Sequence, residues 1–346
     1  MTEPALHADR GVLVVVPCLN EETHIESLLI GLLSDPGAVG GLIVVADGGS
    51  TDRTREVVTR IAATYTRVRW LDNPKRLQSA AVNQAVKTFG AGRRWMVRVD
   101  AHATYPSNYV ELLLAAQDRT GADTVVVPMR TRANGCFQLA AATAQNSILG
   151  NGGARHRAAD VGGWVDHGHH ALFEIDAYCA AGGYDEAFSH NEDAELDLRL
   201  RAAGYRIWLA VEAVLDYYPR ASIGKLARQY YNFGSGRART LVRHHVRIKI
   251  RQAVPLLTPP AILLALLTPL HPIFALPLLG WAGACLAAGL LLGAKARKPC
   301  AMGAGFAAMV MHLAWAIGFY ARVLGGGGRT AQPQPFSPAA GAPTAP

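Results

Sequence analysis

The stretch Gly11–Pro17, GVLVVVP, decides the fold class of this chain. Its apolar residues run without a polar break and end at a proline, the pattern of a strand buried on both faces of a parallel sheet. Further apolar runs follow at 42–46, 68–71, 95–99 and 124–129. The segments between them carry apolar residues at helical spacing, namely 21–33, 57–61, 79–89 and 107–117. Strands that alternate with helices predict an α/β fold in which helices cover both faces of a mostly parallel sheet.

The charge of the chain is unevenly placed. The 346 residues carry a net charge of +8, but all 26 acidic residues lie in 1–216, together with only 20 of the 34 basic residues. The other 14 basic residues lie in 217–346, where there is no acid. Apolar residues make up 50% of the chain and charged residues 17%, which excludes a disordered chain. Positive charge confined to one end does not indicate a nucleic-acid partner, and none is expected.

The cysteines show no CxxC pair and no metal-type spacing. An odd number of cysteines, scattered along the chain, argues against a disulfide scaffold and fits a reducing compartment. The five are Cys18, Cys136, Cys179, Cys285 and Cys300. The N-terminal sequence MTEPALHADR is polar and contains acids, so it does not have the pattern of a signal peptide.

The C-terminal part of the chain predicts membrane attachment. No charged residue occurs in 253–293, and a second uncharged run covers 300–321. Since about 20 apolar residues are needed to cross a bilayer, we expect about three membrane helices. They are placed at 253–270, 273–293 and 300–322. The alternative is a buried helical subdomain.

Basic residues flank the first two of these helices on both outer sides, which predicts a multi-pass protein of the cell membrane with a cytoplasmic catalytic domain. The last residues are rich in Gly, Pro and Ala, as linkers and disordered tails are. The expected organisation is an α/β domain (1–221), a basic amphipathic interfacial segment (222–251), membrane helices (252–324) and a disordered tail (325–346).

Polar and acidic residues follow the predicted strands. Asp47 and Asp100 each end a strand, and Asn20 and Glu21 lie just past the end of the first one. In open parallel sheets, ligands bind beyond the carboxyl ends of the strands. Carboxylates repel a bare phosphate, so a diphosphate bound there would need a bridging Mg²⁺ or Mn²⁺. The absence of GxxxxGK[ST] argues against a P-loop nucleotidase, and Gly48-Gly49 is not the GxGxxG of a dehydrogenase.

Four motifs occur in order along the chain: VVVPCLNEE (14–22), VADGGSTDRT (45–54), RVDAHATYP (98–106) and HNEDAELDLRLRAAG (190–204). As a set they resemble family 2 glycosyltransferases with the GT-A fold. Within that family they look like the branch that builds succinoglycan-type exopolysaccharides, which also has C-terminal membrane helices. The resemblance covers residues 11–325.

The resemblance implies a donor-nucleotide pocket at the first two motifs. Asp47 matches the family aspartate that reads the nucleobase and ribose, and Pro17, Asn20 and Glu21 match the base pocket. Asp52 fits either a role on the nucleotide side or a plain helix N-cap. The alternative for Asp47 is the strand-end residue of an ordinary β–turn–α connection.

The resemblance also places a metal site at Asp100-Ala101-His102, where the family has its DxD motif. Asp100 can bridge a divalent cation to the diphosphate. His102 departs from the second aspartate, and its imidazole suits Mn²⁺ better than Mg²⁺. The alternative for His102 is a surface histidine after a strand. The late histidine that many relatives supply as a further ligand is missing from LDYYPRAS (215–222).

Asp193 matches the general base of the family. An inverting transfer needs one carboxylate to take the proton from the attacking hydroxyl as that hydroxyl displaces the nucleoside diphosphate. Glu192 is a second candidate for this role, and a capping acid is the alternative reading of Asp193.

Arg237 lies in QYYNFGSGR (229–237), at the place of a motif of processive synthases whose Arg-Trp is missing here. We expect Arg237 either to pair with a diphosphate of the donor or lipid carrier, or to belong to a basic helix on anionic lipid.

The segment 150–173 is rich in Gly and His and predicts a loop on the acceptor side, with Trp164 available to stack on a sugar. Its three histidines, His167, His169 and His170, are poorly spaced for zinc.

These features predict a membrane-anchored, inverting, metal-dependent glycosyltransferase. From the resemblance, the donor is a UDP-sugar, with glucose as the hexose, and the acceptor is a saccharide on a polyprenyl-diphosphate carrier. One alternative is a non-catalytic, sugar-nucleotide-binding scaffold of a polysaccharide assembly complex. Another is a nucleotidyltransferase, which the acidic loop PCLNEE (17–22) disfavours. No oligomeric state follows from these patterns.

Overall fold

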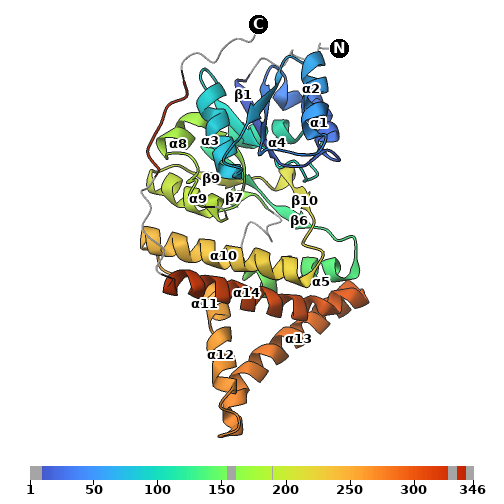
Figure 1. The fold of residues 1–346 in the computed structure, drawn as a ribbon, viewed down its shortest axis with the longest axis vertical. Helices are drawn as coiled ribbons and strands as arrows, with labels where there is room; N and C mark the ends of the chain where they lie inside the picture. The colour runs from blue at the N-terminus through green and yellow to red at the C-terminus, as the bar shows by residue number, and fades with distance from the viewer. Residues whose placement is uncertain (1–9, 154–160, 189, 326–332, 340–346) are drawn as a thin grey trace. The chain divides into compact units, whose positions relative to one another are not determined.

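The computed structural model describes residues 10–153, 161–188, 190–325 and 333–339 (Figure 1). The chain divides into two compact units. The first comprises 1–128, 159–215 and 331–346, and the second comprises 129–158 and 216–330.

The first unit is built on a mixed, mostly parallel sheet, which confirms the predicted α/β class. The strand order is β3-β2-β1-β4-β8-β5-β9-β7. Pairing is parallel between β1 and its neighbours β2 and β4, whereas β8 runs antiparallel to β4 and β5. The strands are β1 Val12–Cys18, β2 Leu42–Asp47, β3 Val68–Asp72, β4 Trp95–Arg98, β5 Thr124–Val127, β7 Gly163–Trp164, β8 His169–Glu174 and β9 Ile207–Leu209.

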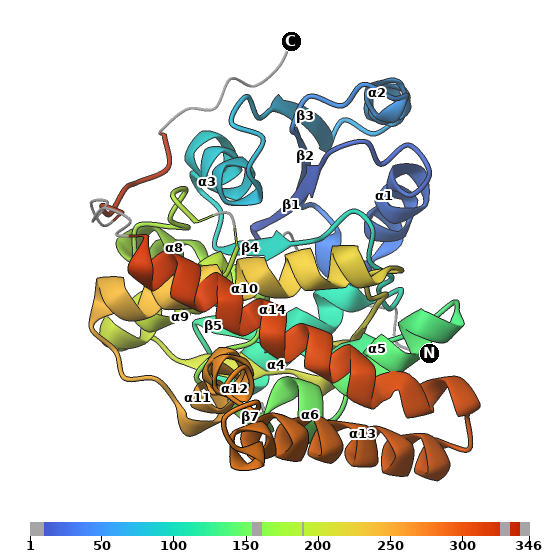
Figure 2. The ribbon, with the colours of Figure 1, turned by 60° about the horizontal axis from the view of Figure 1, so that its bottom comes forward.

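Helices lie on both faces of this sheet, as predicted, with α1 and α3 on opposite sides of β1 (Figure 2). They are α1 Ile25–Ser34, α2 Thr54–Thr64, α3 Gln78–Phe89, α4 Tyr109–Thr120, α8 Ile175–Ala180 and α9 Glu192–Ala202, with the short helices η1 Pro36–Ala38 and η2 Val211–Ala213.

The core of the first unit is organised around β1. Residues 12–16 are fully buried. Leu13 and Val15, which point to one face, share a cluster with Val86 of α3 and Phe173 of β8. Burying one such aliphatic side chain contributes about 1.5–3 kcal/mol. The apolar run therefore holds the strand ends, and the polar residues that follow them, in place.

Residues 333–339 pack within the first unit, so this part of the predicted disordered tail (325–346) is ordered, whereas 326–332 and 340–346 lie outside the described residues. The ring of Phe336 lies edge-on to Tyr178, with ring centroids 6.3 Å apart, and Lys87 Nζ lies 4.9 Å from its centroid. Prolines lose little backbone entropy on ordering, because their φ angle is already fixed. The ring contacts of Phe336 and two backbone hydrogen bonds, from Phe336 to Cys179 and from Ala339 to Lys87, hold a segment whose composition resembles that of a linker.

The second unit consists mainly of helices. α14 packs along α10 and against α5, and α12 and α13 form a hairpin (Figures 1 and 2). The helices are α5 Cys136–Gln145, α6 Ile148–Asn151, α10 Ile223–His244, α11 Ile250–Leu256, α12 Thr258–Ala265, α13 Leu276–Ala296 and α14 Ala304–Leu324, with η3 Pro272–Ala275 and η4 Pro299–Gly303. The strands β6 Met129–Thr131 and β10 Leu215–Tyr217 pair separately from the large sheet.

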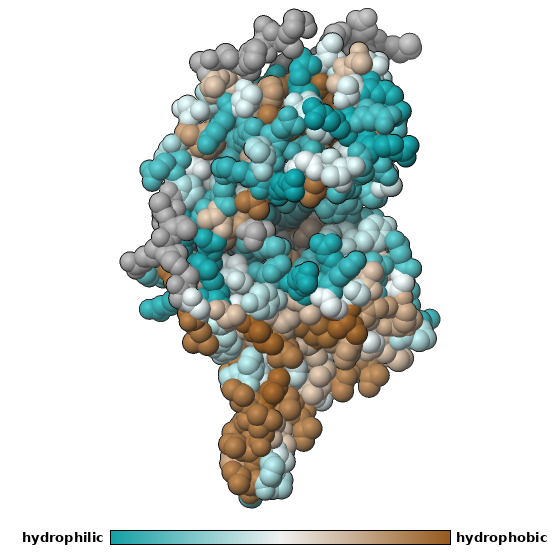
Figure 3. Space-filling view, in the orientation of Figure 1, coloured by the Kyte–Doolittle hydropathy of each residue, from teal (hydrophilic) through white to brown (hydrophobic). Residues whose placement is uncertain are grey.

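Two helical segments in the described part of the chain, Pro272–Ala296 and Pro299–Leu324, are long and apolar enough to cross a membrane. Apolar side chains cover the outer surface of the α12–α13 hairpin (Figure 3). The first expected span, 253–270, is not one continuous helix but the two short helices α11 and α12. Pro259 and Pro260 lack the amide hydrogens that would continue the helix, so a new helix begins at Thr258.

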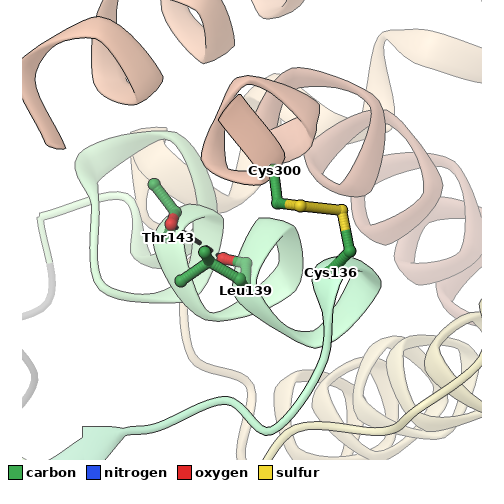
Figure 4. The surroundings of a disulfide bond; sticks show 4 residues. All are labelled: Cys136, Leu139, Thr143 and Cys300. Carbon is green, nitrogen blue, oxygen red and sulfur yellow. Dashed lines mark hydrogen bonds between the residues drawn. A yellow bond between two sulfur atoms is a disulfide. The ribbon is translucent and has the colours of Figure 1, made fainter. Parts of the chain in front are cut away.

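Cys136 and Cys300 form a disulfide, with Cα atoms 5.1 Å apart (Figure 4). The cysteine spacing did not predict this bond, although a single disulfide is not the disulfide scaffold that the spacing argues against. The two residues are separated by 164 positions and meet because α5 packs against η4. Pairing of this kind depends on tertiary packing and cannot be deduced from cysteine spacing. Cys18, Cys179 and Cys285 are free and buried.

We predict that Phe336→Ala lowers the free energy of unfolding of the first unit by about 1–3 kcal/mol, because a half-buried aromatic ring is lost. Thermal unfolding of the detergent-solubilised protein, followed by tryptophan fluorescence, measures the change. The exposed neighbour provides the control, since Ser337→Ala should alter stability by less than about 0.5 kcal/mol. Equal stability of the two variants would show that the ring does not anchor the segment.

Candidate active site

Arg98, the last residue of β4, is the centre of the site. Its side chain is 4% exposed and contacts two carboxylates: Nη1 donates to Asp193 Oδ1 at 2.7 Å, and Nε lies 3.4 Å from Asp100 Oδ1. Arg98 and Asp100 are two residues apart at the end of β4, so their side chains point to the same face of the sheet. Asp193 comes from the first turn of α9. The predicted metal ligand and the predicted base thus meet at one cation.

The guanidinium of Arg98 governs the ionisation of both carboxylates. Burial by itself would raise the pKa of Asp193, but Arg98 and then His170 outweigh it and hold that pKa well below its usual range. Burial likewise opposes ionisation of Asp100, whose pKa is nevertheless lowered by Arg98 and His169. Both carboxylates are therefore negatively charged at neutral pH.

His170 of β8 contacts Asp193 from a fully buried position. Its ring is fully buried, with Nδ1 2.7 Å from Tyr184 Oη and 3.3 Å from Asp193 Oδ1, and Nε2 2.8 Å from Asp197 Oδ1. Burial disfavours the charged ring, but Asp197 and Asp193 outweigh it and raise the pKa of His170 to about 9. The protonated imidazole adds a second positive charge beside Asp193. Tyr184 Oη also accepts a hydrogen bond from Arg98 at 2.9 Å.

Asp100 also contacts residues on the predicted metal side. Its Oδ1 accepts a hydrogen bond from Gln78 Nε2 at 2.6 Å, and its Oδ2 lies 3.6 Å from His169 Nε2. The predicted second ligand, His102, is 60% exposed and has its Nδ1 3.3 Å from Glu21 Oε1. Within the described ranges, no three His, Cys, Asp or Glu side chains gather into a metal-binding group.

Asp100 and His169 fit a divalent cation as two of its ligands. A carboxylate oxygen and an imidazole nitrogen together suit Mn²⁺. Their 3.6 Å separation is shorter than two metal–ligand bonds of about 2.1 Å each, so both can bind one ion. Sites of this kind are completed by substrate phosphates and water. A cation here would therefore be held jointly by the protein and a diphosphate.

Asp47 shapes the turn after β2. It is 4% exposed, and its Oδ2 accepts hydrogen bonds from the amides of Gly49 (2.8 Å) and Ser50 (2.9 Å), while Oδ1 accepts one from the Ser50 hydroxyl. Gly49 has a φ of +87°, which side chains disfavour. Pro17 lies within β1, in register with Ala46 of β2. The carboxylate thus orders the loop that the resemblance assigns to nucleotide binding.

The loops after β1 and β2 are tied to each other. Asn20, at a φ of 56°, accepts a hydrogen bond from the Thr51 amide at 2.8 Å, and Asp52 Oδ2 accepts one from the Glu22 amide at 3.1 Å. Asp52 Oδ1 accepts from the Thr54 amide at 3.0 Å, at the start of α2. Desolvation opposes ionisation, but the hydrogen bonds from Thr54 outweigh it and lower the pKa of Asp52. Asp52 stands one residue before Arg53, the N-cap of α2, and therefore connects the loop after β1 to the start of α2.

The histidines of 167–170 contact acids. His167 Nδ1 lies 2.7 Å from Asp197 Oδ2, opposite the oxygen that His170 contacts. Trp164 is covered on one face by Arg206, whose Cζ lies 3.6 Å from the ring centroid. Part of the expected acceptor-side loop, 154–160, lies outside the described residues.

Arg237 lies in the middle of α10 in the second unit. The predicted basic segment 222–251 thus contains a long helix, in which Leu226, Ala238 and Leu241 are buried. The pairing of Arg237 with a diphosphate stays a prediction.

Arg98, Tyr184 and Asp197 do not stand out in the motif patterns, and His169 and His170 stand out only as poor zinc ligands. One signal was available for Arg98. A lone cation in the apolar strand WMVRV (95–99) must be neutralised, so acids beside it in space are expected. Nothing in the sequence identifies which acids these are.

Comparison with known proteins decides the family. The protein-family model described as Glycosyl transferase family 2 matches residues 13–178 of the sequence. Succinoglycan biosynthesis protein ExoA of Rhizobium meliloti (strain 1021) is 50% identical over 312 residues, which cover 90% of this chain and 94% of that protein. This chain belongs to glycosyltransferase family 2.

A solved structure shares the fold of this family 2 glycosyltransferase. The mannosyltransferase PcManGT from Pyrobaculum calidifontis, in complex with GDP-Man and Mn²⁺, is 19% identical and aligns with a TM-score of 0.56. The alignment covers 92% of this chain and 88% of that one.

We predict that His170 makes stability depend on pH. Its pKa of about 9 in the folded protein lies above the ordinary histidine pKa of 6.5, so protonation favours the folded state. This contribution is complete below pH 6.5 and is lost as the pH rises toward 9. Thermal unfolding between these values should show stability falling in the parent protein but much less in His170→Asn. The exposed histidine variant His24→Gln should retain the parent's slope, and a parent-like slope in His170→Asn would contradict the prediction.

Proposed function

We propose that this glycosyltransferase catalyses an inverting, metal-dependent transfer of a hexose, glucose from UDP-glucose, to a saccharide on a polyprenyl-diphosphate carrier. The observation that supports the proposal is the meeting of Asp100 and Asp193 at the buried guanidinium of Arg98. A carboxylate for the leaving diphosphate and a carboxylate for the acceptor hydroxyl must lie close together in one site, because both act on the same sugar carbon.

Asp193 acts as the base in this proposal. Of the contacts described, those from Arg98 and His170 are to its Oδ1, so Oδ2 of the partly exposed carboxylate receives the acceptor proton. The acceptor oxygen bonds to the anomeric carbon from the face opposite the diphosphate. The bond from that carbon to the diphosphate oxygen breaks, and the nucleoside diphosphate leaves with its electron pair. One displacement therefore inverts the anomeric configuration.

The low pKa of Asp193 determines when the proton moves. Because Arg98 and His170 hold the Asp193 carboxylate ionised, it can accept a proton at any time, but its low pKa makes it a weak base. Proton transfer therefore comes late, when the acceptor oxygen has become acidic by bonding to the sugar. Glu192 is the second candidate, since burial and the neighbouring Asp193 raise its pKa to about 7.

The donor would be held by the two joined loops and by Asp100. Asn20, Glu21 and Asp47 stand at the strand ends where the nucleoside is expected. A divalent cation bound by Asp100 and His169 would offset charge on the departing diphosphate. Arg98 lies next to both carboxylates, and its positive charge reduces the repulsion between them.

The lipid-linked acceptor and the role in exopolysaccharide synthesis follow from the likeness to the succinoglycan biosynthesis protein. The long apolar helices support attachment to the cell membrane, with the catalytic domain on the cytoplasmic side. Attachment would raise the effective concentration of a lipid-linked acceptor at the site.

Asp193→Asn should lower transfer by about 10²–10⁴-fold, because the amide cannot accept the proton. Release of UDP from UDP-glucose by membranes that supply the acceptor measures turnover, and titration with UDP-glucose shows whether the donor still binds. Glu192→Gln is the matched control and should retain most activity. If Glu192→Gln is inactive and Asp193→Asn active, the base is Glu192. If the parent releases no UDP with any sugar nucleotide, the scaffold alternative is supported instead.

Chelation tests the metal. EDTA should abolish transfer, and Mn²⁺ should restore it, with Asp100→Asn needing far more Mn²⁺ than the parent because one ligand oxygen is lost. Binding of UDP to the parent, measured by calorimetry, should strengthen when Mn²⁺ is present. Full activity in the chelator would contradict metal dependence.

A further inference from the structure

We propose that the α12–α13 hairpin enters the bilayer and returns to the catalytic side, and that α14 then lies along the membrane surface beside α10 without crossing. This rests on the membrane attachment proposed above but not on the sugar chemistry. In place of three crossings, the chain enters the bilayer once and returns, so that the first unit and the end of α14 lie on one side of the membrane.

The hairpin has the surface of a lipid-embedded element. Leu266, Leu270, Leu279 and Leu291 are 62–77% exposed, and no charged residue occurs in 253–293. Exposed apolar side chains of this size and continuity require a cover. The most apolar stretch of 272–296 is only 11% buried, whereas that of 299–324 is 44% buried. The two candidate spans therefore differ, because one faces outward almost entirely and the other has nearly half of its most apolar stretch packed against protein.

The disulfide shows that the chain has returned by residue 300. Cys136 begins α5, which precedes every apolar helix of the C-terminal part and follows β6 after a few residues. It therefore lies on the catalytic side. Cys300 of η4 is bonded to it, and a Cβ added at Gly303 would lie 3.1 Å from Ala140 of α5. Any crossing between α5 and η4 is thus matched by a return.

α14 packs on the same elements along its length. His312, in its middle, has Nε2 2.8 Å from the carbonyl oxygen of Leu149 in α6. A Cβ added at Gly234 of α10 would collide with the backbone of Trp315, and one added at Gly318 of α14 would collide with that of Tyr231. α10 and α14 are therefore in direct backbone contact and must occupy the same depth.

The charges of α10 exclude the bilayer core for this pair. The helix carries five basic side chains, Lys225, Arg228, Arg237, Arg239 and Arg243. At the centre of a membrane each would cost about 2.5–3.5 kcal/mol or more. At the surface of an anionic leaflet each would instead contribute about 1 kcal/mol of attraction. A bilayer with anionic headgroups is therefore the partner that fits the helix pair and the hairpin together.

Residues 333–339, which follow α14 in the chain, give independent evidence for the position of the end of α14. The Phe336 amide donates to the Cys179 carbonyl at 3.2 Å, and the Ala339 amide to the Lys87 carbonyl at 2.8 Å, both in the first unit. From Leu324 to Pro333 the chain spans nine residues and reaches at most about 32 Å. A bilayer with its headgroups is about 40–45 Å thick. The end of α14 must therefore lie on the catalytic side.

Cysteine labelling tests the topology. In a background carrying Cys136→Ser and Cys300→Ser, whose other cysteines are buried, single variants Thr66→Cys, Lys298→Cys and Ser337→Cys are expressed in bacterial inner membranes. They report on the catalytic domain, the end of the hairpin and the C-terminal segment. A membrane-impermeant maleimide should label all three from the same face, in inside-out vesicles but not in spheroplasts.

Labelling of Ser337→Cys from the face opposite Thr66→Cys would show that α14 crosses, and the same result for Lys298→Cys would show that the hairpin does not return; either overturns the proposal. If all three are labelled only in spheroplasts, the topology holds and the cytoplasmic orientation proposed above fails.

Flotation with protein-free liposomes of phosphatidylethanolamine and phosphatidylglycerol tests the partner. The purified parent should float with the liposomes, and a double variant with Leu266→Asp and Leu279→Asp should lose at least ten-fold of the floated fraction. Ile148→Asp changes an apolar side chain that is 78% exposed but lies outside the hairpin, so it should float like the parent. If the parent does not float, the hairpin fits a protein partner and the proposal is overturned.

Discussion

The site depends on one constraint, the neutralisation of a buried arginine at the end of a central strand. Arg98 is almost fully enclosed, and a guanidinium in that position is tolerated only when carboxylates and hydrogen-bond acceptors surround it. Asp100 meets this need from the same strand, Asp193 from α9, and Tyr184 through its hydroxyl. Because the ion group is complete only when β4, β8 and α9 are in place, correct folding and correct placement of the acids are the same event.

A second layer of hydrogen bonds supports this ion group. Asn83 Oδ1 accepts bonds from the Tyr178 hydroxyl at 2.6 Å and the Tyr184 amide at 2.9 Å. Phe336 of the C-terminal segment lies against Tyr178, so the last described residues of the chain reach within two side chains of Arg98. Buried polar networks of this kind position a few groups accurately when every member is satisfied. The C-terminal segment is therefore part of the catalytic unit rather than an appendage.

The second unit combines two kinds of apolar helix that hydropathy alone cannot distinguish. In α13 the apolar side chains face outward, and in α14 many of them are used against α5, α6 and α10. Glycines at the contact between α10 and α14 allow the backbones to approach closely. Because α14 is in direct backbone contact with α10, the two helices share one environment, and the basic side chains of α10 disfavour the bilayer core.

The sequence by itself determined the α/β class, the order of the strands along the chain, the loops at their carboxyl ends and the family. These features depend on local periodicity and on motifs that are continuous in the chain. Only the tertiary structure decided that Arg98 joins Asp100 to Asp193, that His170 contacts Asp193, that Cys136 meets Cys300, and that residues 333–339 pack in the first unit. Each of these is a contact between segments far apart in the chain, and its free energy comes from burial and charge compensation that no single segment possesses.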